Sequence, residues 1–313
     1  MSQSGFSTAA VIGTGMMGPG IAMTLALGGV RATILSRTEA GAREGLDKAL
    51  WQLGVLEQNG LADAARAARA RELLAGSAQF DTAIAGVDLV IESAPENMEF
   101  KQGLFARMDA IARPEAVLAS NTSGLSITAI ASSCRRPERV LTTHFWNPPY
   151  LMPLVELVQG EKTDRALALR VRDLLAACGK TPVMVKRDTP GQLGNRLQMA
   201  LVREAVHIVQ QGIAEVEDVD LAVKTGFGLR LPVYGVFEHA DMVGLDLAMS
   251  VLDYAAQDLN REPRAPDLMR DKVARGELGV KTGRGFYDWS KKDAGEVKAR
   301  RDRFVLEFLK TRY

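Results

Sequence analysis

Short apolar runs alternate with helical patterns along the first part of the chain. Several runs are continuous over four to six residues, which is typical of strands buried on both faces. Helical patterns lie between them, including residues 19–27 and 39–74. Strands that alternate with helices indicate a parallel sheet covered by helices on both sides. The predicted strands are residues 9–12, 32–35, 87–91, 116–119, 140–145, 154–158 and 182–185.

The pattern changes after the pair Pro190-Gly191. Apolar residues then recur at helical spacing over residues 195–211, and further helical patterns cover residues 216–224, 237–259 and 300–312. No convincing strand pattern follows. Because a Pro-Gly pair is a natural boundary, the sequence predicts an α/β domain over residues 1–188 and an all-α domain over residues 189–313.

The first predicted strand runs into a glycine-rich turn that opens a helix. Gly13, Gly15 and Gly18 fit the spacing G-x-G-x-x-G, with Met16 and Met17 in the variable places. In such a turn the first glycine permits the tight bend, the second lets a pyrophosphate approach the backbone, and the third lets helix and strand pack closely. The free amides of the helix N-terminus then face the phosphates. This context predicts a dinucleotide-binding, Rossmann-type domain, in preference to a glycine-rich turn without a ligand.

The end of the second predicted strand bears on the choice of cofactor. NAD enzymes usually carry Asp or Glu there, to accept hydrogen bonds from the ribose hydroxyls. This chain reads Ser36-Arg37 instead, with no carboxylate before Glu39. A guanidinium can hold a 2′-phosphate in a bidentate fork, or it can stack on adenine or lie in solvent. We therefore expect NAD or NADP, with NADP slightly favoured.

The composition acts mainly by exclusion. The formal net charge is +1, which creates no field that would gather nucleic acid or a membrane surface. Cys134 and Cys178 stand in neither a metal nor a redox spacing, which favours a reducing cytoplasm. The start lacks the pattern of a targeting segment, and no apolar stretch reaches the roughly 18 residues that cross a bilayer. We expect a cytoplasmic protein whose partner is a small molecule, not nucleic acid or a membrane.

Several further motifs follow one another along the chain. They are Ser120-Asn121-Thr122-Ser123-Gly124-Leu125, His144-Phe145-Trp146-Asn147-Pro148-Pro149, Leu154-Val155-Glu156-Leu157-Val158, Thr189-Pro190-Gly191 with Asn195-Arg196, and Lys281-Thr282-Gly283-Arg284-Gly285-Phe286-Tyr287. With these motifs the chain resembles the 3-hydroxyacyl-CoA dehydrogenase family over nearly its whole length. The resemblance implies a Rossmann-type doubly wound sheet followed by an all-α domain for substrate and dimer contacts, hence a homodimer. This organisation agrees with the pattern described above.

The resemblance also implies hydride transfer between NAD(P) and C3 of a 3-hydroxyacyl-CoA. That reaction needs a base for the hydroxyl proton, and the imidazole of His144 gains and loses a proton near neutral pH. Glu156 matches the family carboxylate that orients the imidazole and stabilises its charged form. Ser123 and Asn195 match positions that bond the substrate oxygens. The alternatives are a satisfied structural histidine, a solvated glutamate and a turn-capping serine.

Other polar residues match the cofactor side of the family site. Asn121 and Asn147 are expected near the nicotinamide, and Glu96 and Lys101 match a further cofactor-side motif. For Glu96 a helix start is a serious competing explanation, because carboxylates are favoured near helix N-termini. No spacing of His, Cys, Asp and Glu suggests a metal site.

Three departures from the family pattern leave the substrate open. Residues 147–156 are closer to λ-crystallin-like gulonate dehydrogenases and carnitine dehydrogenases, which oxidise free hydroxy acids. Gln192 stands where the family usually has an aromatic residue. The arm at residues 64–71 carries arginines that either meet CoA phosphates or form a solvated helix face.

Two other functions therefore compete with the thioester reaction. The first is the dehydrogenation of a free 3-hydroxy acid or related small polar alcohol by the same His–Glu chemistry. A free carboxylate would need a basic clamp, for which Arg196, Lys224 and Arg230 are candidates. The second is a non-catalytic nucleotide-binding protein, and the joint presence of all four catalytic candidates argues against it.

Overall fold

The computed structural model describes residues 5–312, which form two compact units. The first unit holds the residues up to Arg196 and those from Arg300 on, and the second unit holds Leu197–Ala299. The first turn of α8 (Gly194–Gln210) and most of α14 (Ala294–Arg312) thus belong with the first unit. The division predicted between residues 188 and 189 stays a prediction.

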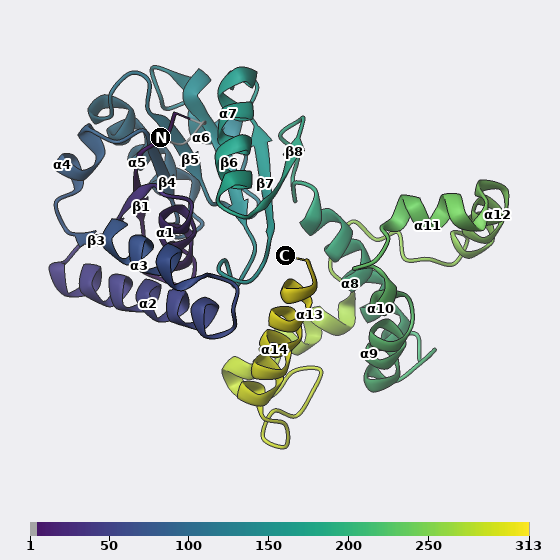
Figure 1. Ribbon diagram of the computed structural model, residues 1–313. Coiled ribbons are helices and arrows are strands. Elements are labelled where there is room, and N and C mark those ends of the chain that lie inside the picture. The colour runs from purple at the N-terminus through teal and green to yellow at the C-terminus, as the bar shows by residue number, and fades with distance from the viewer. Residues whose placement is uncertain (1–4, 313) are drawn as a thin grey trace. The chain divides into compact units, whose positions relative to one another are not determined.

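The first unit is built on one eight-stranded sheet (Figure 1). Its order is β3-β2-β1-β4-β5-β6-β7-β8, and all neighbours are parallel except β6 and β7. The seven predicted strands are present, and β3 is the one the sequence missed, because its Leu-Ala-Gly-Ser run has no strand pattern. The strands are β1 (Thr8–Ile12), β2 (Arg31–Leu35), β3 (Leu74–Ser77), β4 (Leu89–Glu92), β5 (Val117–Ser120), β6 (Val140–Phe145), β7 (Leu154–Gln159) and β8 (Thr181–Val185).

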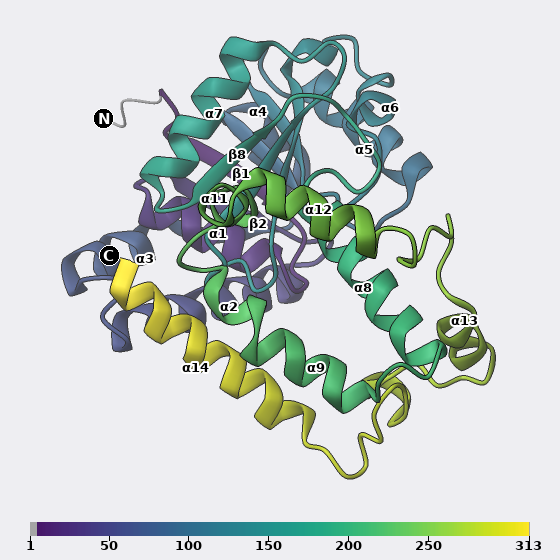
Figure 2. The same ribbon diagram turned by 90° about the vertical axis from the view of Figure 1, so that its right-hand side faces the viewer.

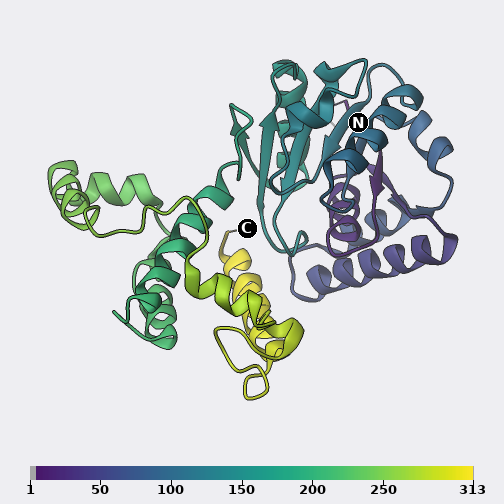
Figure 3. The same cartoon turned by 180° about the vertical axis from the view of Figure 1, so that it is seen from behind.

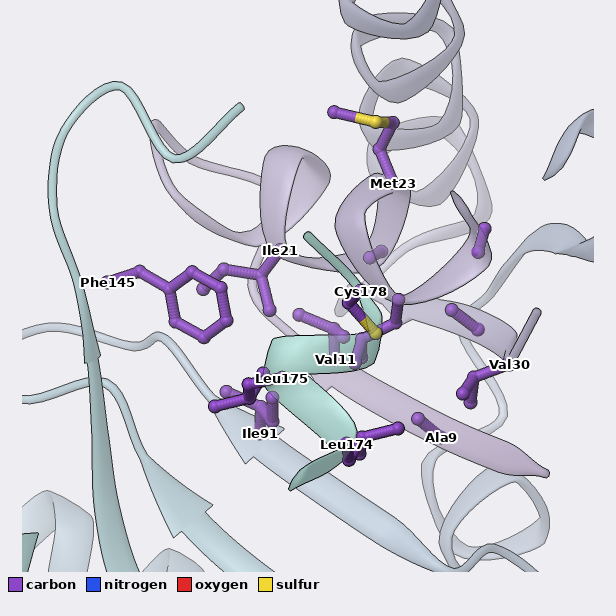
Figure 4. Close-up of a cluster of buried hydrophobic side chains, with 14 of the residues drawn as sticks. Ala9, Val11, Ile21, Met23, Val30, Ile91, Phe145, Leu174, Leu175 and Cys178 are labelled. Carbon is purple, nitrogen blue, oxygen red and sulfur yellow. The ribbon is translucent and has the colours of Figure 1, made fainter. Parts of the chain in front are cut away.

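Helices cover both faces of this sheet, as expected for a doubly wound fold. On one face Ile21, Leu174 and Leu175 pack over Val11 and Ile91 of the strands (Figure 4). The helices of that face are α1 (Gly18–Leu27), α2 (Glu39–Gln58), α3 (Ala64–Leu73), α7 (Arg165–Ala177) and the end of α14. The helices of the other face are α4 (Phe80–Ala85), α5 (Met98–Ile111) and α6 (Ile127–Ala131).

Two long helices predicted from the sequence are each broken in two. The pattern at residues 39–74 ends α2 at Gln58, turns at Gly60 with φ +74°, and restarts as α3 with Asp63 as its N-cap. The pattern at residues 237–259 is interrupted at Gly244, whose φ is +99°. In both places the helix ends at a glycine with a positive φ, which residues that carry a Cβ rarely adopt.

The second unit is helical, as predicted (Figures 2 and 3). Within its described residues the only β pairing consists of isolated bridges from Arg284 to Gly279 and Asp288. Besides most of α8, its helices are α9 (Val216–Thr225), α10 (Phe227–Arg230), α11 (Val236–Val243), α12 (Leu245–Ala255) and α13 (Asp267–Ala274).

In residues 5–312, no helix is both long and apolar enough to cross a membrane. Residues 1–4, which belong to the segment inspected for a targeting signal, lie outside the described residues. The cytoplasmic localisation stays a prediction.

Candidate active site

The glycine turn after β1 leaves room where a phosphate group would lie. Gly13 has φ +114°, and a Cβ on it would come 2.5 Å from the backbone oxygen of Ser93. A Cβ on Gly18 would come 1.8 Å from the Gly13 oxygen, whereas one on Gly15 would meet nothing within 4 Å. The side chain of the α1 N-cap residue, Met17, accepts no hydrogen bond from the helix, so the first N–H groups of α1 have no capping partner. The turn therefore fits the pyrophosphate of a dinucleotide.

The end of β2 presents the groups predicted for the adenosine ribose. Ser36 is half-buried, and its backbone amide donates to the Ser77 oxygen at 3.1 Å. Arg37 is exposed and makes no hydrogen bond or ion pair with any described residue. The Glu39 carboxylate accepts the backbone N–H of Ala78 at 3.1 Å. The first carboxylate after β2 is thus engaged with the protein, while a guanidinium is available.

The antiparallel pairing of β6 and β7 places His144 directly opposite Glu156. Nδ1 of His144 lies 2.9 Å from Oε2 of Glu156, and the two side chains are buried. Because the carboxylate can only accept, Nδ1 carries the proton and Nε2 is left as the acceptor. The sequence predicted this pair, and the register of two neighbouring strands brings it together.

Both oxygens of Glu156 are held by hydrogen bonds. Oε2 also accepts the indole N–H of Trp146 at 2.9 Å, and Oε1 accepts the backbone N–H groups of Leu193 and Gly194 at 2.9 and 2.8 Å. Burial raises the pKa of Glu156, but hydrogen bonds from His144, Gly194, Trp146 and Leu193 outweigh it and hold the pKa at about 2. Glu156 is therefore an anion at neutral pH, in a fixed orientation.

Ser123 and Asn195 also meet within the first unit. The side-chain Nδ2 of Asn195 donates to the backbone oxygen of Ser123 at 2.9 Å. The Ser123 backbone N–H donates to Glu96 Oε1 at 2.6 Å, which fixes the turn after β5. Asn121, in the same turn, accepts the backbone N–H of Phe145 at 2.8 Å and so ties the turn to the end of β6. These bonds place all four catalytic candidates at one edge of the sheet.

The remaining cofactor-side candidates differ in their surroundings. Lys101 is buried, with Nζ 2.6 Å from Oε1 of Glu92 and 3.5 Å from Oε2 of Glu96. The hydroxyl of Ser120 donates to the other Glu92 oxygen at 2.6 Å. Glu96 and Lys101 thus bond to protein groups that shape the sheet edge, and their cofactor role stays a prediction. Asn147 is exposed and makes no hydrogen bond with a described residue.

Three residues of this edge were not predicted as site residues from the sequence, although Gln192 was noted as a departure from the family pattern. Trp146 lies two residues after His144, so the two-residue period of a strand would have placed it on the same side. Glu92 ends a buried strand, where a lone charge is itself a signal. Gln192 is buried with φ +53°, and its Nε2 donates to the Thr122 oxygen at 3.0 Å. Only the folded chain shows that bond, because it joins residues 70 positions apart.

Two family models match nearly the whole chain. The model described as 3-hydroxyacyl-CoA dehydrogenase, NAD binding domain, matches residues 8–189. The one described as 3-hydroxyacyl-CoA dehydrogenase, C-terminal domain, matches residues 191–289.

Individual relatives agree with these models. A 5-formyl-3-hydroxy-2-methylpyridine 4-carboxylate 5-dehydrogenase of Mesorhizobium japonicum is 35% identical, covering 95% of each chain. A probable 3-hydroxybutyryl-CoA dehydrogenase of Bacillus subtilis is 36% identical, covering 90% of this chain and 97% of the relative. A crystal structure of the first kind of enzyme, an NAD+-dependent dismutase, has a TM-score of 0.90 at 32% identity, covering 96% and 97% of the two chains. That of the (S)-3-hydroxybutyryl-CoA dehydrogenase of Ralstonia eutropha has a TM-score of 0.76 at 33% identity, covering 91% and 99%. The chain is therefore a member of the 3-hydroxyacyl-CoA dehydrogenase family, an oxidoreductase with an NAD-binding domain.

Proposed function

We propose that this chain transfers a hydride between NAD and C3 of a 3-hydroxyacyl-CoA, with His144 and Glu156 as the acid–base pair. The observation that carries the proposal is the buried bond of 2.9 Å between Nδ1 and Oε2, which leaves Nε2 as the proton acceptor. Residues 13–18 and the N-terminus of α1 would hold the pyrophosphate of NAD, whose nicotinamide ring supplies the hydride acceptor.

This geometry defines the path of the hydroxyl proton. In oxidation, Nε2 of His144 takes the hydroxyl proton as the C3–H bond gives its electron pair and hydrogen to the nicotinamide. The products are a 3-oxo compound, reduced cofactor and an imidazolium, which the Glu156 anion stabilises. Ser123 and Asn195, joined at 2.9 Å, bind the substrate oxygen. In reduction the imidazolium returns the proton to that oxygen.

The test removes the imidazole of His144 and leaves the cofactor-binding turn intact. His144→Ala should lose several orders of magnitude in turnover and bind NADH with unchanged affinity, because the glycine turn is untouched. His239→Ala is the matched control, since His239 is a half-buried histidine of the second unit. Near-normal turnover of His144→Ala would contradict the assignment.

A second candidate substrate is a small carboxylated alcohol or aldehyde without CoA. The TM-score of 0.90 to the pyridine-carboxylate enzyme favours it, against 0.76 for the hydroxybutyryl-CoA enzyme. In the arm at residues 64–71, for which CoA contact and a solvated helix face were both open, Arg66 Nε donates to the Leu27 oxygen at 3.0 Å, and Arg71 pairs with Glu57. These two arginines already have protein partners, which leaves Arg69 as the arm's freer charge.

A substrate screen separates the two candidates. Acetoacetyl-CoA, free 3-oxo acids and a carboxylated pyridine aldehyde would be offered with reduced and oxidised cofactor. If the thioester is the substrate, Arg69→Ala should raise its KM several-fold, whereas Arg172→Ala, an exposed arginine of α7, should not. Turnover of the free carboxylates alone would move the chain to the second candidate.

For the cofactor, we propose that the adenosine site also accepts the 2′-phosphate of NADP. Two observations support this proposal. Arg37, beside Ser36, makes no ion pair with a described residue, and the Glu39 carboxylate already accepts the backbone N–H of Ala78. Binding of NADH and NADPH would be compared by nicotinamide fluorescence. Arg37→Ala should weaken NADPH binding about tenfold more than NADH binding, a loss typical of one charge-assisted contact. Equal effects on both cofactors would contradict this, and Arg31→Ala serves as the exposed control.

For assembly, we propose a homodimer formed through the second unit. Its helices α11 and α12 expose large apolar side chains, including Phe237 at 86%, Met242 at 76% and Tyr254 at 83%. Apolar groups exposed together to this extent mark an interaction surface. Light scattering should give twice the chain mass, and Phe237→Ser should shift it toward the monomer. A monomer at micromolar concentration would contradict the proposal.

A further inference from the structure

Trp146 follows β6 and bonds to the same oxygen that orients His144. Its Nε1 donates to Oε2 of Glu156 at 2.9 Å, and Nδ1 of His144 lies 2.9 Å from that atom. The imidazole and indole rings are 5.7 Å apart between centroids, with 48° between their planes. Two donors therefore share one carboxylate oxygen, and only one of them can change its charge.

The position of the indole is fixed by the start of α8. A Cβ on Gly194 would lie 2.4 Å from Cζ2 of Trp146, so the ring occupies the space that any larger residue would fill. The backbone N–H of Gly194 in turn donates to Oε1 of Glu156 at 2.8 Å. The Trp146 ring, the start of α8 and the Glu156 carboxylate thus restrain one another. This restraint keeps the indole N–H directed at Glu156.

The indole bond has a chemical consequence for the histidine. An N–H donor that binds a carboxylate draws on its negative charge and weakens the attraction that the same oxygen exerts on an imidazolium. The other partners of Glu156, the amides of Leu193 and Gly194, are also uncharged. The other charged groups described at this sheet edge are Lys101, Glu92 and Glu96, where the Lys101 ammonium lies 2.6 Å from Glu92 and 3.5 Å from Glu96, and none of them bonds to Trp146 or Glu156 in the described residues. Among the described partners of Glu156, His144 is thus the only one that titrates.

We propose that Trp146 is a positioning residue that lowers the proton affinity of His144 through Glu156. It keeps His144 in the neutral, proton-accepting form down to a lower pH than the His–Glu pair alone would allow. The proposal rests on the acid–base role given to the pair under the proposed function. The proposal adds that the indole of Trp146, which neither gains nor loses a proton, adjusts the proton affinity of His144.

The direct test is Trp146→Phe, which keeps an aromatic ring and removes the N–H. The chain has three histidines, so the His144 ring can be assigned in an NMR titration by its loss in His144→Ala. In Trp146→Phe we expect the pKa of His144 to rise by about half to one pH unit. The acidic limb of kcat/KM for alcohol oxidation should move to higher pH by the same amount. A purely structural role for Trp146 would lower the rate at all pH values and leave both midpoints in place.

Two controls isolate the path through Glu156. Trp51→Phe removes another indole N–H, from a side chain that is 63% exposed, and should move neither midpoint. In a Glu156→Gln background, Trp146→Phe should no longer shift the His144 midpoint, because the shared anion is gone. An unchanged midpoint in Trp146→Phe, or the same shift in the Glu156→Gln background, would overturn the proposal.

A measurement on the intact tryptophan covers the case in which Trp146→Phe does not fold. The variant with Trp51→Phe and Trp289→Phe keeps Trp146 as its single tryptophan. Its indole N–H resonance should titrate with the midpoint of His144, since both donors share Oε2. An indole resonance that stays constant through the His144 titration would overturn the proposal. The NMR titration needs no substrate. It therefore tests the role of Trp146 even if the dehydrogenase assay fails and the proposed function is wrong.

Discussion

Glu156→Gln changes the charge at the centre of the site and almost nothing of its shape. The carboxylate accepts four hydrogen bonds, two at each oxygen. A glutamine amide has one oxygen and one NH2 group, and the NH2 group can only donate. In either orientation of the glutamine side chain, its NH2 group faces two other donors. These are His144 and Trp146 in one orientation, and the backbone N–H groups of Leu193 and Gly194 in the other. The substitution therefore leaves donors unmatched in a buried place.

The loss of stability can be estimated from the pKa. The difference between the ordinary value of 4.5 and the value of about 2 corresponds to about 3 kcal/mol, at about 1.4 kcal/mol per pH unit. Because the folded-state pKa is depressed, this stabilisation is fully present above pH 4.5. It is lost as the pH falls from about 4.5 to about 2. Glu156→Gln should therefore be less stable by about 3 kcal/mol at pH 7, and the gap should narrow in that acidic window.

The loss of activity should be larger. With an amide oxygen turned to His144, the ring keeps its tautomer but loses the anion that stabilises the imidazolium. With the NH2 group turned to it, Nδ1 must accept, and the proton moves to Nε2, where the base is needed. A change of this kind at a His–carboxylate pair costs about 10^4-fold in turnover in serine proteases. We expect a loss of about 10^3- to 10^4-fold in kcat, with NADH affinity unchanged.

The assays are turnover from the reduced-nicotinamide absorbance, NADH binding by fluorescence, and urea unfolding at pH 7 and pH 3. Glu156→Asp, which keeps the charge and shortens the reach, is the matched variant and should keep more activity than Glu156→Gln. Turnover of Glu156→Gln within tenfold of the natural protein would refute the acid–base assignment. A stability difference that is equal at both pH values would refute the electrostatic account.

Three further predictions concern packing within the first unit. Gly194→Ala should cost about 1–3 kcal/mol in urea unfolding and lower turnover, because its Cβ would lie 2.4 Å from the Trp146 ring; unchanged stability would show that the ring moves freely. Lys101→Met should cost about 3–5 kcal/mol in thermal melts, since it leaves the buried Glu92 without its cation; a normal melt would argue against the pair. Leu309→Ala should cost about 2–5 kcal/mol, since that side chain is 5% exposed in the core of the first unit; no loss would mean that α14 does not pack there.

Much of the fold could be predicted from the chain alone, because buried parallel strands and glycine turns leave local signals. The apolar runs marked seven of the eight strands, and the spacing of Gly13, Gly15 and Gly18 marked the nucleotide turn. The missed strand, β3, has no apolar run, and its place is decided by pairing with β2. The breaks at Gly60 and Gly244 were missed because helical periodicity continues across them.

The candidate site divides in the same way. The family resemblance of the sequence motifs selected Glu156, Ser123 and Asn195, and for His144 it agreed with the need for a base that titrates near neutral pH. Only the tertiary structure decided what surrounds them. The antiparallel register of β6 and β7 sets the contact between the first two, and the start of α8 closes on Glu156 from a distant part of the chain. Hydrogen bonds between residues far apart in sequence depend on strand register and helix placement, and no local pattern encodes those.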